Sequence, residues 1–125
     1  MNKAKFFAVA LASVMALTSG TAMAAGDAAK GKKVFKKCKA CHSVKAGKKK
    51  VGPSMFGVAG RKAGTAKGYK FSAAMKDSGL TWDDATLDKF LKKPRKFIKR
   101  TKMSFNGLKK EKQRADVIAY LKTLK

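Results

Sequence analysis

Apolar residues recur at helical spacing soon after residue 26. The stripe consists of Ala28, Gly31, Phe35 and Cys38, and Asp27 just before it can cap a helix that runs to about Cys38. A glycine inside a helix lowers helix stability, so its presence in this stripe favours close approach by another helix.

A second apolar stripe near the end of the chain supplies the candidate partner helix. Over residues 110–124 the apolar side chains follow the i, i+3, i+4, i+7 pattern of a helix that buries one face. We predict that the two terminal helices cross at Gly31, with Phe35 near Tyr120. The second stripe consists of Val117, Tyr120, Leu121 and Leu124.

Two shorter helices are expected between the terminal ones. Ser72 can cap a short helix that ends at Gly79, and Asp83 or Thr81 can cap a longer one that runs through Lys93. The apolar face of the longer helix consists of Leu87, Phe90 and Leu91.

The rest of the chain reads as loop. Residues 45–68 are rich in glycine and show no alternation of apolar and polar positions, which favours turns over strands. Pro94 is expected to end the helix that runs through Lys93, and residues 95–108 are predicted to be irregular. The predicted fold is all-α, with short helices and long loops. So much loop in a small domain is reasonable only if a buried cofactor gives the loops a surface to pack on.

The first 24 residues have the pattern of a secretory signal peptide. Lys3 and Lys5 precede an apolar run over residues 6–18, and Ala22-Met23-Ala24 is a small-x-small cleavage site. An uncut segment that spans a membrane is the alternative. We expect cleavage after Ala24 or Ala25, export to the periplasm, and a single mature domain of residues 25–125 that spans no membrane.

The charge of the chain is strongly positive. The 125 residues carry 31 Lys and Arg against seven Asp and Glu, a formal charge of +24. Lys3 and Lys5 leave with the signal segment, so 29 basic and seven acidic side chains remain, a charge of +22. Such a charge can serve solubility alone, but it favours acidic partners that are attracted electrostatically. Charge alone would also suit nucleic acid or an anionic membrane, and export argues against nucleic acid.

The sequence Cys38-Lys-Ala-Cys41-His42 carries the chemistry. C-x-x-C-H is the attachment motif of c-type haem, and the chain has no other cysteine or histidine. A zinc site would need about four protein ligands. A thioredoxin-like dithiol would need a βαβ pattern, which the sequence lacks, and a structural disulfide would leave the adjacent histidine unexplained.

With His42 as one axial ligand of a haem iron, a methionine is expected as the other, because the chain has no second histidine. Met55 lies close to the attachment motif, Met75 lies within a short predicted helix, and Met103 lies far enough along to reach the opposite haem face. Spacing favours Met103 over Met75, although most methionines merely fill a core.

From residue 25 onward the chain resembles the class I cytochromes c, and most closely the bacterial cytochrome c2 and mitochondrial-type branch. The resemblance covers nearly all of the mature chain, in order. The segments that carry it are Gly31-Lys-Lys-Val-Phe35, Cys38-x-x-Cys-His42, Gly52-Pro53, Gly60-Arg-Lys-Ala-Gly64, Gly79-Leu-Thr-Trp82, Leu91 with Pro94, Thr101-Lys-Met-Ser-Phe105 and Asp116-Val-Ile-Ala-Tyr-Leu-Lys122.

The resemblance implies a small cytochrome c fold wrapped around one covalent haem c. Cys38 and Cys41 would form the thioethers, and His42 and Met103 would bind the iron. The carbonyl of Pro53 would accept the second N–H of the histidine ring. The side chains that would hold the haem propionates are Arg61, Ser72, Trp82 and Thr101. Leu91 and Phe105 would form the wall of the haem pocket on the Met103 side.

Several residues depart from the mitochondrial pattern. Phe71 and Phe90 stand where tyrosines are usual, and Met75 stands where an asparagine commonly helps to hold a water. We therefore predict a dry pocket around Met103, with no side-chain donor from position 75 or 90 on its sulfur. Lys99-Arg100 replaces a Pro-Gly turn.

The function that follows from the resemblance is one-electron transport by a soluble, monomeric carrier, for example in a respiratory chain, and not enzymatic catalysis. The expected partners are acidic redox proteins: a terminal oxidase, a bc1-type complex, a reaction centre or a periplasmic dehydrogenase. A periplasmic haem peroxidase or a thiol–disulfide oxidoreductase is the alternative. In the family, the lysines and arginine that surround the exposed haem edge correspond to Lys37, Lys39, Lys50, Arg95, Lys96, Lys102, Lys109 and Lys110.

Overall fold

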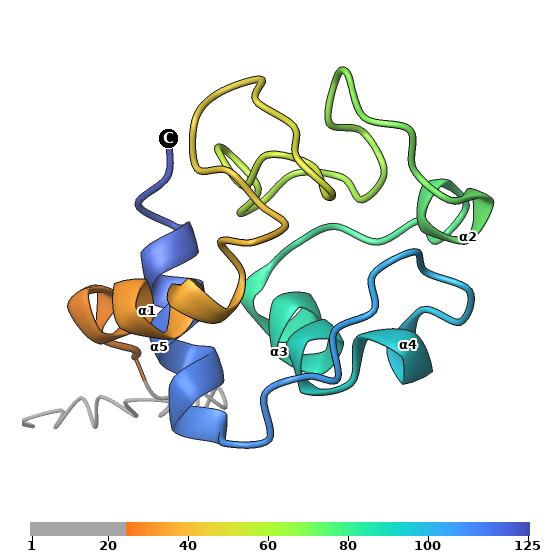
Figure 1. Ribbon diagram of the computed structural model, residues 1–125. Helices are drawn as coiled ribbons and strands as arrows, with labels where there is room; N and C mark the ends of the chain where they lie inside the picture. Colours follow the sequence, from red (N-terminus) through yellow and green to blue (C-terminus); the bar gives the residue numbers. More distant parts are fainter. Residues whose placement is uncertain (1–24) are drawn as a thin grey trace, which may run out of the picture.

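The computed structural model describes residues 25–125, so the predicted signal peptide lies outside the described residues. The described chain consists of helices joined by long loops, and its one β-type contact is an isolated bridge between Lys62 and Thr81. The all-α prediction is therefore confirmed (Figure 1). The elements are α1 (Ala28–Val34), the 3₁₀ turn η1 (Phe35–Lys37), α2 (Ala73–Lys76), α3 (Asp84–Lys92), α4 (Pro94–Phe97) and α5 (Glu111–Leu121).

Helices α1 and α5 cross at Gly31, as predicted. A Cβ atom on Gly31 would collide with the backbone carbonyl of Asp116, so the two backbones are in direct contact there. Beside the crossing, the rings of Phe35 and Tyr120 lie 5.4 Å apart between centroids. The crossing brings the first and last helices of the described chain together, and the attachment motif follows at the end of η1.

The N-terminus of α1 is bound to α5 through one carboxylate. Asp27 caps α1 by accepting the N–H of Lys30 at 3.1 Å. Its own N–H donates to the carboxylate of Asp116 at 2.8 Å, and Lys112 donates to the same oxygen at 2.5 Å. Asp116 is therefore a buried acceptor that links the two terminal helices.

The predicted caps of the two middle helices are present. The Ser72 hydroxyl accepts the N–H of Met75 at 3.1 Å, and Asp83, rather than Thr81, accepts the N–H of Thr86 at 2.8 Å. Helix α2 is shorter than predicted, because it ends at Lys76 and not at residue 79. The predicted apolar face of α3 is buried.

One prediction for the loops is wrong. Residues 95–108 were expected to be irregular, but Pro94 begins a further helical turn, α4. Proline fits the first position of a helix because no partner is needed there for its missing N–H. Pro94 thus ends one helix and starts the next.

A buried arginine fixes the loop that leads into α5. Arg114 donates from Nε to Asp88 of α3 at 2.6 Å, and one of its terminal nitrogens donates to the carbonyls of Leu108 and Lys109 at 2.9 Å each. These bonds hold α3, α5 and the loop before α5 in one arrangement. Within residues 25–125 no helix is both long and apolar enough to cross a membrane.

Candidate functional site

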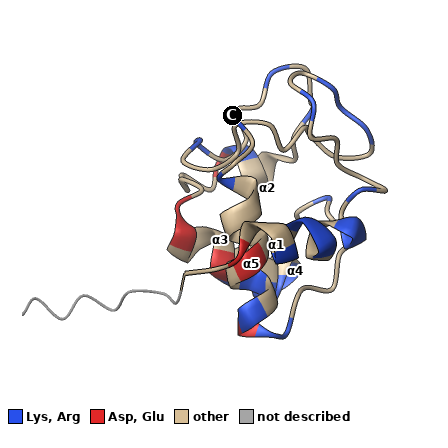
Figure 2. Ribbon diagram, turned by 90° about the vertical axis from the view of Figure 1, so that its left-hand side faces the viewer, with Lys and Arg blue, Asp and Glu red and all other residues tan. Residues whose placement is uncertain are grey.

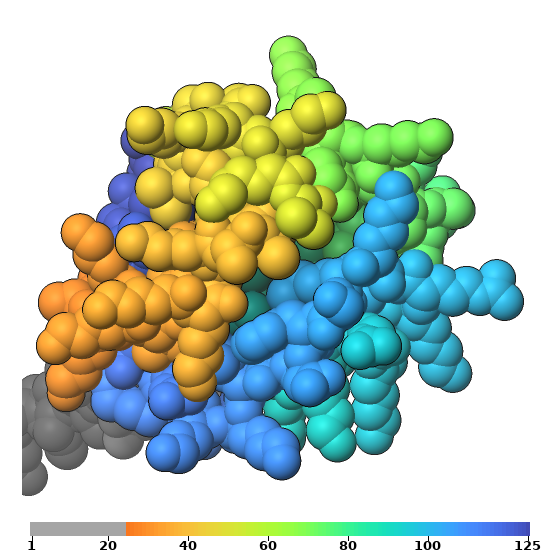
Figure 3. All heavy atoms as spheres, viewed as in Figure 1, coloured from red at the N-terminus to blue at the C-terminus, as the bar shows by residue number. Residues whose placement is uncertain are grey.

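The loops and helices surround a cavity of about 730 Å³. In Figure 3 its opening lies between the orange and yellow segment around residues 38–55 and the blue segment around residues 100–108. The fold brings all of the predicted site residues to this one cavity, although they are spread over 68 positions of the chain. The lining includes Cys38, Cys41, His42, Pro53, Arg61, Ser72, Trp82, Leu91, Thr101, Met103 and Phe105.

His42 is held in a single orientation by the loop that follows it. Its Nδ1 donates to the carbonyl of Pro53 at 2.8 Å, so the proton of the neutral ring sits on Nδ1 and Nε2 is free to act as a ligand. Gly52 lies against the ring, and a Cβ atom there would collide with it. The N–H of Gly52 also donates to the carbonyl of Cys41 at 2.7 Å, which binds this loop to the attachment motif.

The ring of His42 is kept neutral. Burial lowers the pKa of His42 below its ordinary value of 6.5, and the positive charge of Lys50 acts in the same direction. The hydrogen bond to the Pro53 carbonyl opposes the lowering but does not cancel it. A neutral imidazole with a free Nε2 is the form that binds a metal.

The two cysteines lie on one turn at the edge of the cavity. The N–H groups of Cys41 and His42 both donate to the carbonyl of Cys38, at 3.1 and 2.9 Å, which folds the motif into a tight turn. Both thiols are free; Cys38 is half-buried and Cys41 is exposed. Burial raises the pKa of the Cys38 thiol. Within the described residues no three His, Cys, Asp or Glu side chains are grouped as a metal site.

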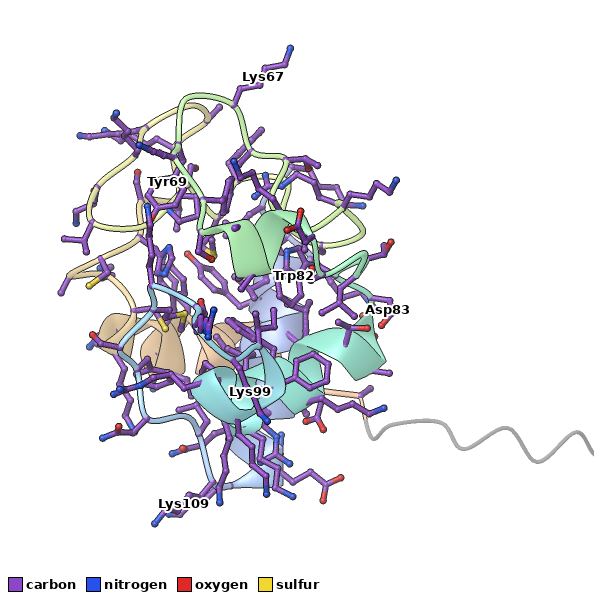
Figure 4. The ribbon with its side chains drawn as sticks, turned by 90° about the vertical axis from the view of Figure 1, so that its right-hand side faces the viewer. Lys67, Tyr69, Trp82, Asp83, Lys99 and Lys109 are labelled. Carbon is purple, nitrogen blue, oxygen red and sulfur yellow. The ribbon has the colours of Figure 1, made fainter. Side chains whose placement is uncertain are left out.

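A loop with a methionine faces the cavity from another part of the chain. Met103 is half-buried, and its N–H is held by the hydroxyl of Thr101 at 3.4 Å. Leu91 and Phe90 of α3 are buried beside the cavity, and the Phe90 ring packs on Trp82 at 4.9 Å between centroids. In Figure 4, Trp82 lies between α2 and α3.

Polar groups that can bind carboxylates lie at another part of the cavity. Arg61 donates to the carbonyls of Phe56 at 3.1 Å and Ser54 at 3.4 Å, and burial lowers the pKa of its guanidinium. The hydroxyl oxygen of Ser72 is used as the cap of α2, which leaves its hydrogen free to donate. Of the described residues that line the cavity, six are basic and none is acidic.

Several residues at the opening have no recognisable signal in the sequence. Lys50 and Lys102 are expected only as members of the basic residues around the haem edge, and no sequence pattern distinguishes Tyr69. All three donate hydrogen bonds to backbone carbonyls across the opening. Gly52 was named only within a motif, and its contact with the histidine ring depends on how the loop folds back.

The lining fits a c-type haem. The cavity is large, its exposed lining is mainly apolar, and it combines two thiols, a nitrogen ligand and a thioether sulfur with donors for carboxylates. The described residues contain no buried side-chain nitrogen or oxygen without a hydrogen-bond partner, so an apolar ring would leave no unpaired buried side-chain polar atom in the lining.

Comparison with known proteins gives the same result. The family model of cytochrome c matches residues 28–125. Cytochrome c2 of Rhodomicrobium vannielii is 50% identical over 120 residues, covering 95% of this chain and 96% of that protein. Cytochrome c-554 of Methylosinus trichosporium is 44% identical over 122 residues, covering 97% of this chain and 92% of that protein.

A solved structure is also similar. Cytochrome cH from Methylobacterium extorquens matches with a TM-score of 0.75 and 54% sequence identity, over 78% of this chain and 99% of that one. The family match covers most of the chain, and the fold and the cavity agree with it. The chain therefore belongs to the cytochrome c family: it is an electron carrier with a covalently bound haem c, and not an enzyme.

Proposed function

We propose that the chain carries single electrons on one haem c whose iron is bound by His42 and Met103. Thioethers from Cys38 and Cys41 would hold the haem. The observation that carries the proposal is that the three side chains of the attachment motif and Met103, which lies far from them in the sequence, line one cavity. When bound, the haem supplies the redox chemistry, because its iron accepts and releases one electron.

The residues of the chain have three tasks in this proposal. The Pro53 carbonyl and Gly52 fix the ring of His42 with Nε2 free, so that this nitrogen would bind the iron, and the hydrogen bond would make it a stronger donor. Met103 offers a soft sulfur, which favours the reduced iron. The buried apolar side chains of α3 and α5 exclude water from the site.

The propionates would be held by the polar side of the cavity. Arg61 supplies the positive charge, the Ser72 hydroxyl has a free hydrogen, and Trp82 and Thr101 lie in the same lining. Leu91 and Phe105 would form the apolar wall on the Met103 side. The six basic residues at the cavity would favour acidic partner proteins such as an oxidase, a bc1-type complex, a reaction centre or a dehydrogenase.

The cellular setting follows from the N-terminal segment. We propose that the signal peptide directs the chain to the periplasm and is removed after Ala24 or Ala25, leaving one monomeric domain. A peroxidase or a thiol–disulfide oxidoreductase is not supported, because the similar proteins are cytochromes c.

Visible spectra of the exported protein, oxidised and reduced, test the proposal directly. We expect a haem that stays bound after denaturation and a charge-transfer band of the methionine–iron bond in the far red. The Met103→Leu variant should lose this band, whereas Met75→Leu, the matched change at another methionine of the cavity, should keep it. A band that survives in Met103→Leu and disappears in Met75→Leu would assign the ligand to Met75 instead.

A further inference from the structure

Ser54 is a buried serine whose hydroxyl makes two hydrogen bonds. Its exposed fraction is 9%, and it directly follows Pro53, the residue whose carbonyl accepts the hydrogen bond of His42. The Ser54 hydroxyl donates to the carbonyl of Lys45 at 2.6 Å and accepts the N–H of Phe56 at 3.1 Å. Serine side chains are mostly exposed in proteins, so a buried serine that acts as both donor and acceptor points to a specific task.

This hydroxyl joins the two segments that hold the histidine ring. The histidine segment is residues 42–45, and the facing segment is residues 53–56. Besides the bond from His42 to Pro53, the N–H of Met55 donates to the carbonyl of Ser43 at 2.8 Å. The Ser54 hydroxyl adds a third bond, to the last residue of the histidine segment. The two segments are therefore joined by an imidazole, a backbone N–H and a hydroxyl.

The direction of the Pro53 carbonyl is linked to Ser54 through the backbone. The carbonyl belongs to the peptide group that joins Pro53 to Ser54. Because the proline ring fixes its own φ angle, this carbonyl turns away from His42 mainly by rotation of that shared peptide group. A serine that is held by its side chain restricts the rotation.

A second side chain holds the facing segment. Arg61, at the polar part of the cavity, donates to the carbonyls of Phe56 at 3.1 Å and Ser54 at 3.4 Å. The hydroxyl and the carbonyl of Ser54 are thus both bound, the first to the histidine segment and the second to Arg61. Ser54 is the residue through which the two sets of contacts meet.

We propose that Ser54 is a positioning residue for His42, because its hydroxyl keeps the facing segment where the Pro53 carbonyl accepts the Nδ1 proton. The proposal rests on the proposed function, since it takes His42 as the iron ligand. A well-directed bond at Nδ1 makes Nε2 a stronger donor, and a stronger donor favours the oxidised iron. Ser54 acts through His42: among the described residues that line the cavity it does not occur.

Exchange of the His42 Nδ1 proton with deuterium, followed by NMR in the reduced holoprotein, measures how often the bond to Pro53 opens. The chain has no other histidine, so the resonance is unambiguous. Ser54→Ala removes the hydroxyl and keeps the Cβ. We expect exchange to be about fivefold faster, the factor that corresponds to one ordinary hydrogen bond, and the reduction potential to become more positive. Ser54→Thr keeps a hydroxyl and should restore both values.

Ser78→Ala is the matched control. The Ser78 hydroxyl makes the same pair of bonds in another loop, because it donates to the carbonyl of Met75 at 2.8 Å and accepts the N–H of Leu80 at 3.4 Å. Its loss should lower the free energy of unfolding by a similar amount and leave the exchange of the His42 proton unchanged. Equal exchange in Ser54→Ala and the wild type, or equal acceleration in Ser78→Ala, would overturn the positioning role.

A second control lies beside the histidine. Ser43 adjoins His42, and its hydroxyl accepts the N–H of Lys45 at 3.1 Å within the histidine segment. Because this bond does not join the two segments, Ser43→Ala should change the exchange of the ring proton little. An acceleration as large as that in Ser54→Ala would mean that the histidine segment holds the ring by itself, without the link through Ser54.

A further readout separates this proposal from the choice of ligand. The amide N–H of Met55, which joins the two segments, should exchange faster in Ser54→Ala than in the wild type, whichever group binds the iron. A wild type whose His42 ring protons have the chemical shifts of an unligated histidine would refute the ligation by His42. A wild type with ligated shifts, in which Ser54→Ala changes neither exchange nor potential, would refute the role of Ser54 alone.

Discussion

The orientation of His42 depends on the absence of a side chain at Gly52. A methyl group at this position would collide with the imidazole ring, and the hydrogen bond to the Pro53 carbonyl restrains the ring from turning away. Gly52→Ala is therefore expected to force the ring or the loop out of place. We predict a loss of about 1–3 kcal/mol in the free energy of unfolding, as for other overpacked sites.

Denaturant unfolding followed by the haem absorption measures this loss. Val51→Ala is the control, because the neighbouring Val51 side chain is 74% exposed and its removal should change stability by less than about 0.5 kcal/mol. A Gly52→Ala protein as stable as the control would mean that the ring can shift without cost.

Arg100 is a second residue whose backbone matters more than its side chain. Among the described residues it is the one non-glycine residue with a positive φ, 67°, in the left-handed region. This conformation costs a residue with a Cβ roughly 1–2 kcal/mol, and it lies three residues before Met103. We predict that Arg100→Gly raises the free energy of unfolding by up to about 1 kcal/mol. The gain is smaller than the strain that is removed, because glycine also gains freedom in the unfolded chain.

The comparison variant for Arg100 is Arg100→Gln, which removes the same charge and keeps the Cβ. Urea unfolding should show that Arg100→Gly is the more stable of the two. If both variants gained equally, the gain would come from reduced charge repulsion and not from the backbone.

At the scale of the elements, the crossing of α1 and α5 holds the fold together. Helix propensity alone would make Gly31→Ala stabilising by about 1 kcal/mol. The collision with the Asp116 carbonyl opposes this, because both colliding groups are backbone or Cβ atoms that cannot swing away. We predict a net loss of about 1–3 kcal/mol in the free energy of unfolding, measured by thermal or urea denaturation. Lys33→Ala, an exposed change on the same helix, should be close to neutral.

The link between the terminal helices should also depend on pH. The N–H of Asp27, followed by the Lys112 ammonium, lowers the pKa of Asp116 below its ordinary value of 3.8. A carboxylate whose pKa is lowered in the folded protein contributes its full stabilisation when the pH is above the ordinary pKa. This contribution is lost as the pH falls through the pKa of the folded state. Asp116→Asn should therefore be less stable at neutral pH and should lose less stability between neutral pH and strong acid.

A series of urea unfolding curves between neutral pH and pH about 2 would measure this difference. Asp84→Asn serves as the comparison, since it removes an exposed ion pair with Lys122. If the free energy of unfolding fell as steeply with decreasing pH in Asp116→Asn as in Asp84→Asn, the role of Asp116 would be contradicted.

The elements that the sequence predicted correctly are those with local signals. The caps Asp27, Ser72 and Asp83 each bind the backbone three residues later, and the apolar face of α3 follows from spacing alone. Helix α4 does not follow from the sequence pattern, because a proline can either end a helix or begin one. The bonds of Lys50, Tyr69 and Lys102 span 11, 18 and 32 positions, and no local pattern could have predicted their partners.

At the scale of the whole molecule, charge is unevenly distributed. Five of the seven acidic residues belong to α3, its cap and α5, whereas basic residues occur on all of the α-helices and in the loops (Figure 2). The described lining of the cavity holds six basic residues and no acidic one. The surface around the haem edge would therefore be positively charged where it meets a partner. Acidic partners are attracted in an orientation that brings this edge toward them.

Electron transfer to an acidic redox protein should therefore slow as salt is added. The Debye length falls from about 30 Å at 0.01 M to about 10 Å at 0.1 M ionic strength, which screens charges across an encounter complex. Lys37→Glu, at the cavity, should slow transfer at low salt about thirtyfold, because it turns an attraction of about 1 kcal/mol between unit charges in water into a repulsion of similar size. Lys67→Glu makes the same change on a side chain that projects away from the body of the molecule in Figure 4. The second-order rate constants of both variants, measured by stopped flow over a range of salt, should converge at high ionic strength. Equal slowing by both would mean that net charge, and not the basic surface at the cavity, determines the encounter.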